Sequence, residues 1–287
     1  MNSIGLFVGQ TTIDIQYLVE NFLKSNTKTK AKQYGISTGG PAANAAITFS
    51  YLGGESHLWS VIGNHFFTDF ICEELEHYNV KVSDLLPDSK NYPVIASIIS
   101  TESSGDRSIV YTISDDAPIP PEFLREINTY RFNIVLVDGL NMKASITVAK
   151  YAKNNNIPVV LDGGSWKDGM ESLLPYVTFA ICAEDFYPPD IHYNKSVLDY
   201  LSLKNIEYSA ITRGGNSIIY KTNKNYGEII VDSLNVIDTL GAGDIFHGAF
   251  CYYYIKSNNF VSALTNASRT ASMSCQFFGT RSWMNKL

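Results

Sequence analysis

The 287-residue sequence has few cysteines and few charged side chains. Its four cysteines, Cys72, Cys182, Cys251 and Cys275, are far apart, and no two of them form a Cys-x-x-Cys pair. This spacing argues against a zinc site or a redox dithiol and predicts free thiols in a reducing compartment. Charged residues make up only 17% of the chain, which argues against a disordered protein or a coiled coil.

Long apolar runs and an excess of basic residues are also missing. No apolar stretch reaches the roughly 18 residues that a membrane-spanning helix needs. The first residues lack the basic start and cleavage site of a signal peptide, so we expect a cytoplasmic protein. The formal net charge of -6 argues against nucleic acid or an anionic membrane as a partner. The 45% of hydrophobic residues is enough for one large core.

Short apolar runs alternate with helical patterns along most of the chain. The predicted buried strands are Ile4–Val8 and residues 58–62, 134–138, 159–162, 179–182 and 209–212. The predicted helices are Pro41–Tyr51 and residues 66–78, 143–154, 195–204, 244–256 and 261–278. This alternation is typical of an α/β fold with a mostly parallel central sheet that helices cover on both faces.

Two stretches break the alternation of strands and helices. Residues 12–38 are mostly polar, and residues 93–115 hold two strand-like pieces joined by a turn-like segment at 101–106. We therefore expect one domain over residues 1–287, with a small antiparallel sheet formed by these two stretches as a lid. A sheet that stands away from the core needs its second face covered, by a ligand or by another subunit.

The most informative segment is Asp-Thr-Leu-Gly-Ala-Gly-Asp at positions 238–244, which follows a predicted strand and opens a predicted helix. The backbone amides of Gly241, Ala242 and Gly243 at a helix start can bind an oxyanion or a phosphate. Asp244 places a carboxylate beside the position where negative charge would develop. Amides for charge and a carboxylate for a hydroxyl proton suit phosphoryl transfer.

This glycine segment has other possible interpretations. A dinucleotide-binding fingerprint needs a third glycine where the chain has Phe246, and the P-loop string Gly-x-x-x-x-Gly-Lys-Ser/Thr is absent. The plainest alternative is a glycine turn in which Asp244 interacts with the helix dipole. We expect that dipole to keep Asp244 ionised and weakly basic.

A second glycine segment, Gly39-Gly40-Pro41-Ala42-Ala43-Asn44, precedes a helix of small residues. Together with positions 238–244, and in this order and separation, it resembles the two signatures of the ribokinase-like (PfkB) carbohydrate kinases over nearly the whole chain. Within that family the context of Arg107 and the spacing of Asp14 look most similar to ketohexokinase and fructokinase types. The resemblance implies a three-layer ribokinase-like α/β fold with a small β-sheet lid.

The resemblance also assigns roles to residues. It makes Asp244 the catalytic base, and Gly241, Ala242 and Gly243 the anion hole. It implies that the sugar is bound by Asp14, Gly39, Gly40, Asn44 and the lid residue Arg107. From the residues alone, Asp14 could be a surface carboxylate and Arg107 a solvated residue of an edge strand.

The nucleotide side carries weaker signals. The segment Thr212, Arg213, Gly214 and Gly215 resembles the family's nucleotide loop, with Ser217 where the last glycine is expected. Its plain alternative is a β-hairpin turn between Ile211 and Ile218. The resemblance further places Ser268, Ala271 and Gly279 near the adenine, with helix packing as the alternative for the first two.

The metal side departs from the family pattern. Many relatives carry an Asn-x-x-Glu motif that organises Mg²⁺, and the segment at 182–185 lacks it, which leaves Glu184 as a water-mediated metal ligand. A monovalent cation such as K⁺ occurs near the counterparts of Asp238 and Gly279 in several relatives.

The predicted function is an ATP-dependent sugar kinase that uses Mg²⁺. Fructose is the first substrate candidate, ribose the second and a nucleoside the third. A homodimer formed through the lid is expected. The alternative from another class is a sugar- or nucleotide-binding sensor that has this fold and has lost catalysis.

Overall fold

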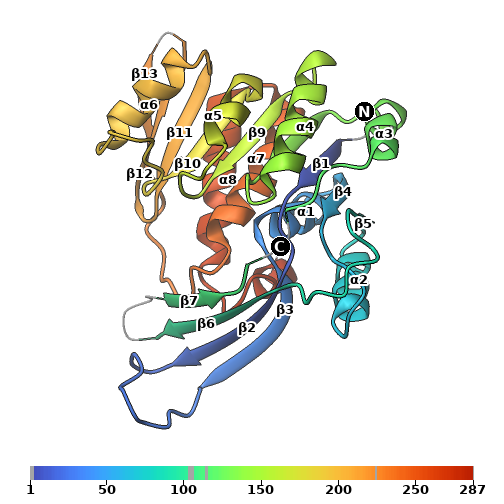
Figure 1. Cartoon of the computed structure of the whole chain (residues 1–287). Coiled ribbons are helices and arrows are strands. Elements are labelled where there is room, and N and C mark those ends of the chain that lie inside the picture. Colours follow the sequence, from blue (N-terminus) through green and yellow to red (C-terminus); the bar gives the residue numbers. More distant parts are fainter. Residues whose placement is uncertain (1–2, 103–106, 114–115, 224, 287) are drawn as a thin grey trace.

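A computed structural model describes residues 3–102, 107–113, 116–223 and 225–286. The main body is a nine-stranded sheet in the order β13-β12-β11-β10-β9-β8-β1-β4-β5 (Figure 1). Its seven strands from β11 to β5 are parallel, and β12 and β13 add antiparallel at one edge. The predicted, mostly parallel sheet is therefore confirmed.

The strands of this sheet are β1 (Ile4–Val8), β4 (Glu55–Ser60), β5 (Val80–Asp84), β8 (Ile134–Val137), β9 (Val159–Gly163), β10 (Phe179–Ala183), β11 (Tyr208–Arg213), β12 (Asn216–Lys221) and β13 (Tyr226–Ile229). The α-helices are α1 (Pro41–Tyr51), α2 (Thr68–His77), α3 (Pro121–Tyr130), α4 (Met142–Asn154), α5 (Met170–Leu173), α6 (Asn194–Leu203), α7 (Ala242–Ser257) and α8 (Phe260–Ser274). Short 3₁₀ turns lie at Leu174–Tyr176 and Ser282–Lys286.

Helices cover both faces of the main sheet, because side chains of successive strand residues point to opposite faces. In β1, Phe7 packs in the core shared with α1, α2, α7 and α8, whereas Leu6 and Val8 pack with α3, α4, α5 and α6. All three side chains are fully buried. Such burial on both faces explains why these strands appear in the sequence as continuous apolar runs.

The close packing of α1 on α7 depends on small residues. A Cβ atom added at Gly248 of α7 would lie 2.3 Å from the Ala45 carbonyl oxygen of α1. The alanines of α1 at positions 42, 43, 45 and 46 are all fully buried. This contact brings the beginnings of the two helices together, and with them Asn44 and Asp244.

The lid is a second sheet of four strands in the order β3-β2-β6-β7, formed by β2 (Thr12–Val19), β3 (Gln33–Gly39), β6 (Val94–Thr101) and β7 (Arg107–Tyr111). Figure 1 shows it projecting beneath the main body. The expectation of an antiparallel sheet is wrong at its centre, where β2 pairs with β6 in parallel. β2 is the next strand after β1 along the chain, and β6 is the next strand after β5.

The sequence prediction located most elements to within a few residues. β1 and α1 have the predicted bounds, and α7 begins at Ala242, two residues before the predicted start. The predicted turn at 101–106 lies partly outside the described residues, because 103–106 are not described. Within the described chain, every helix is too short or too polar to traverse a bilayer.

Candidate functional site

A cavity of about 340 Å³ lies between the lid and the carboxyl ends of the parallel strands. The body contributes Asn44, Asp138, Asp162 and Asp244 to its lining, and the lid contributes residues that include Asp14 and Arg107. Crevices outside the carboxyl ends of parallel strands are where open α/β sheets bind ligands. The cavity collects the predicted base and most of the predicted sugar contacts.

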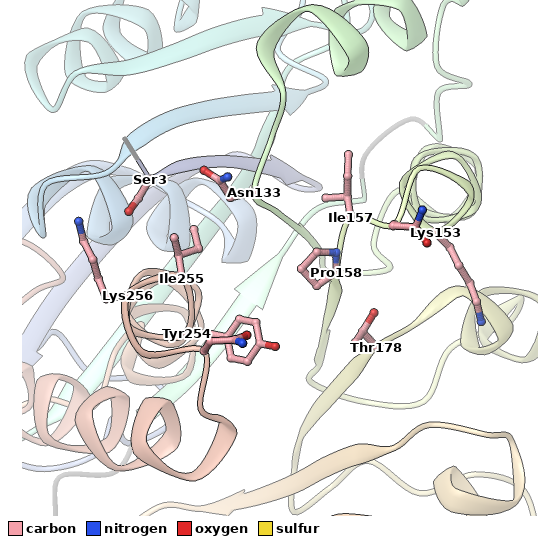
Figure 2. A pocket seen from close by; sticks show the side chains of 11 residues that line it. Ser3, Asn133, Lys153, Ile157, Pro158, Thr178, Tyr254, Ile255 and Lys256 are labelled. Atoms are coloured by element: carbon pink, nitrogen blue, oxygen red, sulfur yellow. The ribbon is translucent and has the colours of Figure 1, made fainter. Parts of the chain in front are cut away.

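A larger cavity of about 820 Å³ lies at the amino-terminal ends of the parallel strands (Figure 2). Asn133, Pro158 and Thr178, which line it, each come directly before a parallel strand. It contains Lys153, but the Lys153 ammonium already donates to the Pro175 carbonyl oxygen at 2.6 Å. None of the residues predicted for the site lines this cavity.

Asp244 lies in the first turn of α7, where its Oδ2 accepts a hydrogen bond from Asn44 Nδ2 at 2.7 Å. Asp244 is half-buried and lines the cavity, and protein atoms surround its carboxyl group. This desolvation, with the nearby charge of Asp162, raises the pKa of Asp244 to about 7. The expectation of a weakly basic carboxylate is therefore wrong, because burial outweighs the helix dipole.

The glycine loop before α7 presents backbone donors beside this carboxylate. Gly241 has the left-handed conformation, with φ of 69°, and forms the N-cap of the helix. The Ala242 amide donates to the Thr239 carbonyl oxygen at 3.2 Å, which leaves the amides of Gly241 and Gly243 as the free donors of this described loop. Amides in the first turn of a helix have no acceptor inside it, so these two can bind an anion.

Gly39, in the Gly39-Gly40 turn before α1, makes room for the Asp14 carboxylate. A Cβ atom at Gly39 would lie 1.9 Å from Asp14 Oδ2, and one at Gly40, whose φ is 95°, would lie 2.4 Å from the Gln10 carbonyl oxygen. Asp14 is buried and accepts a hydrogen bond from Thr12 Oγ1 at 2.6 Å, and burial raises the pKa of its carboxyl group. Asp14 is thus a lining group of the cavity rather than a surface carboxylate.

Three lid side chains hold the segment that precedes the glycine loop. Arg107 donates to the carbonyl and hydroxyl oxygens of Thr239, the latter at 2.8 Å. Gln16 Nε2 donates to Asp238 Oδ2, and Ser100 Oγ donates to Asp238 Oδ1 at 3.3 Å. Strands β2, β6 and β7 of the lid therefore contact Asp238 and Thr239, directly before the glycine loop.

The same contacts decide whether a monovalent cation fits at Asp238. Besides Gln16 and Ser100, the backbone amides of Leu240 and Gly279 donate to this carboxylate, at 3.1 and 2.9 Å. A carboxylate has about four acceptor positions, and here each described contact is a donor. The cation expected from the resemblance does not fit this carboxylate, because donors, among them the Gln16 amide, occupy its acceptor positions.

Two buried carboxylates of the cavity were not among the predicted site residues. Asp138 follows β8 and accepts the amides of Gln10 and Leu140 at 2.7 and 2.9 Å, and burial raises its pKa to about 6. Asp162 lies in β9, 3.4 Å from the His247 ring. Both end a predicted strand just before a glycine, so their positions at the carboxyl edge could have been inferred.

The residues predicted for the nucleotide do not line the cavity. Thr212, Arg213, Gly214 and Gly215 form the end of β11 and the turn into the antiparallel β12, as the hairpin alternative has it. Ser268 and Ala271 are buried within α8. Gly279 has φ of 77° and reaches Asp238 through its amide. Nucleotide binding by these residues stays a prediction.

Glu184 follows β10 and is exposed. The described residues contain no cluster of three metal-ligating side chains of the His, Cys, Asp and Glu types. Mg²⁺ that keeps most of its waters and is held by nucleotide phosphates does not need such a cluster, and Glu184 as a water-mediated ligand stays a prediction.

Comparison with known proteins gives the chain its family. The model of the pfkB family carbohydrate kinases matches residues 6–286. Ribokinase of Bacillus subtilis (strain 168) is 23% identical over 96% of this chain and 94% of its own length. A nucleoside kinase of Methanocaldococcus jannaschii is 25% identical over 87% and 82%. Ketohexokinase of Mus musculus is also similar, at 19% identity over 96% of both chains, so the bacterial ribokinase is more similar than the ketohexokinase.

Solved structures share the fold. A putative ribokinase from Agrobacterium tumefaciens superposes with a TM-score of 0.86 at 22% identity, covering 99% of this chain and 94% of that one. Ribokinase of Arabidopsis thaliana, solved with ribose and ATP, covers both chains fully with a TM-score of 0.73 at 19% identity. These likenesses confirm the predicted ribokinase-like fold. The chain belongs to the pfkB family of carbohydrate kinases, which are phosphotransferases with an alcohol group as acceptor.

Proposed function

We propose that this protein transfers the γ-phosphate of ATP to a hydroxyl group of a small sugar, with ribose and fructose as the first candidates. The observation that carries the proposal is the position of Asp244. Asp244 lines a 340 Å³ cavity, accepts a hydrogen bond from Asn44 and directly follows the free amides of the glycine loop. That volume is at the small end of ligand pockets.

The residues have distinct roles in this reaction. The sugar hydroxyl oxygen attacks the γ-phosphorus of ATP, the bond from this phosphorus to the β,γ-bridging oxygen breaks, and ADP leaves with the bond's electron pair. Asp244 accepts the hydroxyl proton, and the amides of Gly241 and Gly243 donate to the phosphoryl oxygens. Mg²⁺, when bound with the nucleotide, neutralises phosphate charge. Asp14 and Asn44 orient the sugar.

The lid has two roles in the proposed reaction. Its Val94, Ala96, Ile98 and Ile109 give the cavity an apolar wall on the side away from the main sheet. Because water competes with the sugar as phosphoryl acceptor, such a wall favours transfer to the sugar. Arg107 anchors the lid to Thr239 and thereby fixes it relative to the glycine loop.

Sugar turnover tests the proposal. ADP release is measured with ribose, fructose, deoxyribose and adenosine, each with ATP and Mg²⁺. The ribokinases among the relatives favour ribose, and the ketohexokinase among them favours a ketohexose such as fructose. Turnover of ribose or fructose above the other acceptors supports the proposal. Saturable sugar binding without turnover would indicate the sensor instead.

The rate should depend on pH through Asp244. A base must be ionised, and the pKa of Asp244 is raised to about 7, so the reactive carboxylate is lost as the pH falls through 7. We expect kcat/KM to decrease about tenfold for each pH unit below that pKa. The measurement is kcat/KM between pH 5 and 9, with ATP-analogue binding over the same range as the control. A flat profile down to pH 5 contradicts the assignment.

We further propose a homodimer through the outer face of the lid. Tyr17, Tyr34, Ile36 and Val110 lie on the face opposite Asp14 and Gln16, by the strand registers, and are 41%, 75%, 54% and 75% exposed. Such an apolar sheet face is stabilised by a second copy. Light scattering should give twice the chain mass, and Val110→Glu should give the monomer. A monomeric wild-type protein at micromolar concentration contradicts this expectation.

A further inference from the structure

Arg281 follows α8 and reaches the candidate site from the carboxyl-terminal end of the chain. Its side chain is only 13% exposed. The guanidinium donates to Asn44 Oδ1 at 2.8 Å, to the Thr38 carbonyl oxygen at 2.7 Å and to Thr280 Oγ1 at 2.8 Å. Its Nε lies 3.5 Å from Glu74 Oε1, which balances the charge.

These contacts fix the orientation of the Asn44 amide. A guanidinium can only donate, so the side of Asn44 that faces Arg281 must be its oxygen. The amide nitrogen then faces Asp244, where it donates at 2.7 Å to Oδ2. Asn44 thus acts toward the base as a donor, because Arg281 occupies its acceptor.

Arg281 also holds the backbone at the entrance of α1. Glu74 Oε2 accepts the Thr38 amide at 2.6 Å while Arg281 donates to the Thr38 carbonyl oxygen. Thr38 directly precedes Gly39 and Gly40, the turn from which Asn44 is presented. The Glu74–Arg281 pair therefore holds both backbone groups of Thr38, just before the turn that leads to Asn44.

We infer that Arg281 is a positioning residue for Asp244 and acts through Asn44. By keeping the amide N–H₂ of Asn44 on the carboxylate, Arg281 stabilises the ionised base. Without Arg281 the side-chain amide of Asn44 can flip and present its oxygen to Asp244, which disfavours the charged form of Asp244. The inference deepens the proposed function, since it concerns the same base, but the arrangement it describes can be measured without turnover.

The test reads the pKa of Asp244 directly, from the carboxyl ¹³C shift of full-length protein labelled with [¹³C]aspartate. Loss of the signal in Asp244→Asn assigns it. Arg281→Met is expected to raise the pKa by about one unit, equal to a tenfold smaller ionised fraction at a pH well below it. Arg269→Met, at an exposed position of α8, is the control and should leave the pKa unchanged.

A double-mutant cycle separates transmission through Asn44 from a direct effect of charge. In the Asn44→Ala background, Arg281→Met should shift the pKa of Asp244 by much less than in the wild type. An equal shift in both backgrounds overturns the inference, since Arg281 would then act by its own charge. An unchanged pKa in Arg281→Met overturns it as well.

A second variant covers the case in which Arg281→Met does not fold. Arg281→Lys keeps the positive charge opposite Glu74, but a single ammonium lacks the planar fork that reaches Asn44 and Thr38 together. It should raise the pKa of Asp244 in the wild-type background and not in the Asn44→Ala background. A pKa equal to that of the wild type would contradict the inference. Sugar turnover by the wild type tests the proposed function separately.

Discussion

Asp244→Asn should lower kcat about 10²- to 10⁴-fold while ATP binding changes little. The substitution keeps the shape of the side chain, and its carbonyl oxygen can still accept from Asn44 Nδ2, so the packing around α7 is retained. It removes the group that accepts the hydroxyl proton. Because the amides of the glycine loop are untouched, the phosphate contacts remain.

The measurement for Asp244→Asn combines coupled ADP release with calorimetric binding of a non-hydrolysable ATP analogue. Asp69→Asn is the matched control, since Asp69 is an exposed carboxylate in the first turn of α2. It should retain wild-type kcat. If Asp244→Asn turns over sugar at a near-normal rate, Asp244 is not the base and the site assignment fails.

Gly241→Ala is the second substitution with a large expected effect. Gly241 has φ of 69°, and a Cβ atom there would lie 2.6 Å from Thr280 Cγ2 and 3.6 Å from Asn44 Nδ2. The left-handed conformation disfavours alanine by about 1–2 kcal/mol, and the clash must move the loop or Thr280. Displacing one donor of an anion hole lowers kcat about 10²- to 10³-fold, and we expect a loss of this size.

Gly53→Ala is the matched control for backbone strain. Gly53 has φ of 100° in the turn between α1 and β4, and an added Cβ atom would find its nearest neighbour, Tyr252 Oη, at 3.6 Å. Both variants should lower the thermal midpoint, but only Gly241→Ala should lose kcat. A Gly241→Ala enzyme with the kcat of Gly53→Ala would show that the loop amides do not contribute to catalysis.

Most of the fold could be predicted because its elements have local signals. Strands β8, β9 and β10, which lie between β1 and β11 in the sheet, are buried on both faces and appear as apolar runs. Gly40 and Pro41 mark the start of α1. The antiparallel β12 and β13 were missed because they lie at the sheet edge, where part of each strand is open to solvent. The parallel pairing of β2 with β6 depends on contacts across some 80 residues.

The candidate site was predictable where chemistry follows from adjacent residues. Gly241, Ala242 and Gly243 stand beside Asp244 in the sequence, so donors and carboxylate were expected together. Arg281 was missed because nothing near it in the sequence marks it. Its partner Asn44 is 237 positions away, and only the packed structure brings the two together.

The sequence by itself determined the alternation of strands and helices, the two glycine turns and the carboxylate that follows the second turn. These depend on local backbone freedom and on apolar periodicity. Only the tertiary structure decided the hydrogen-bond partner and the pKa of that carboxylate. Asn44, 200 positions away, donates to Asp244, and burial near Asp162 raises the pKa of Asp244 to about 7. A pKa depends on solvent and charges in space, which local sequence does not specify.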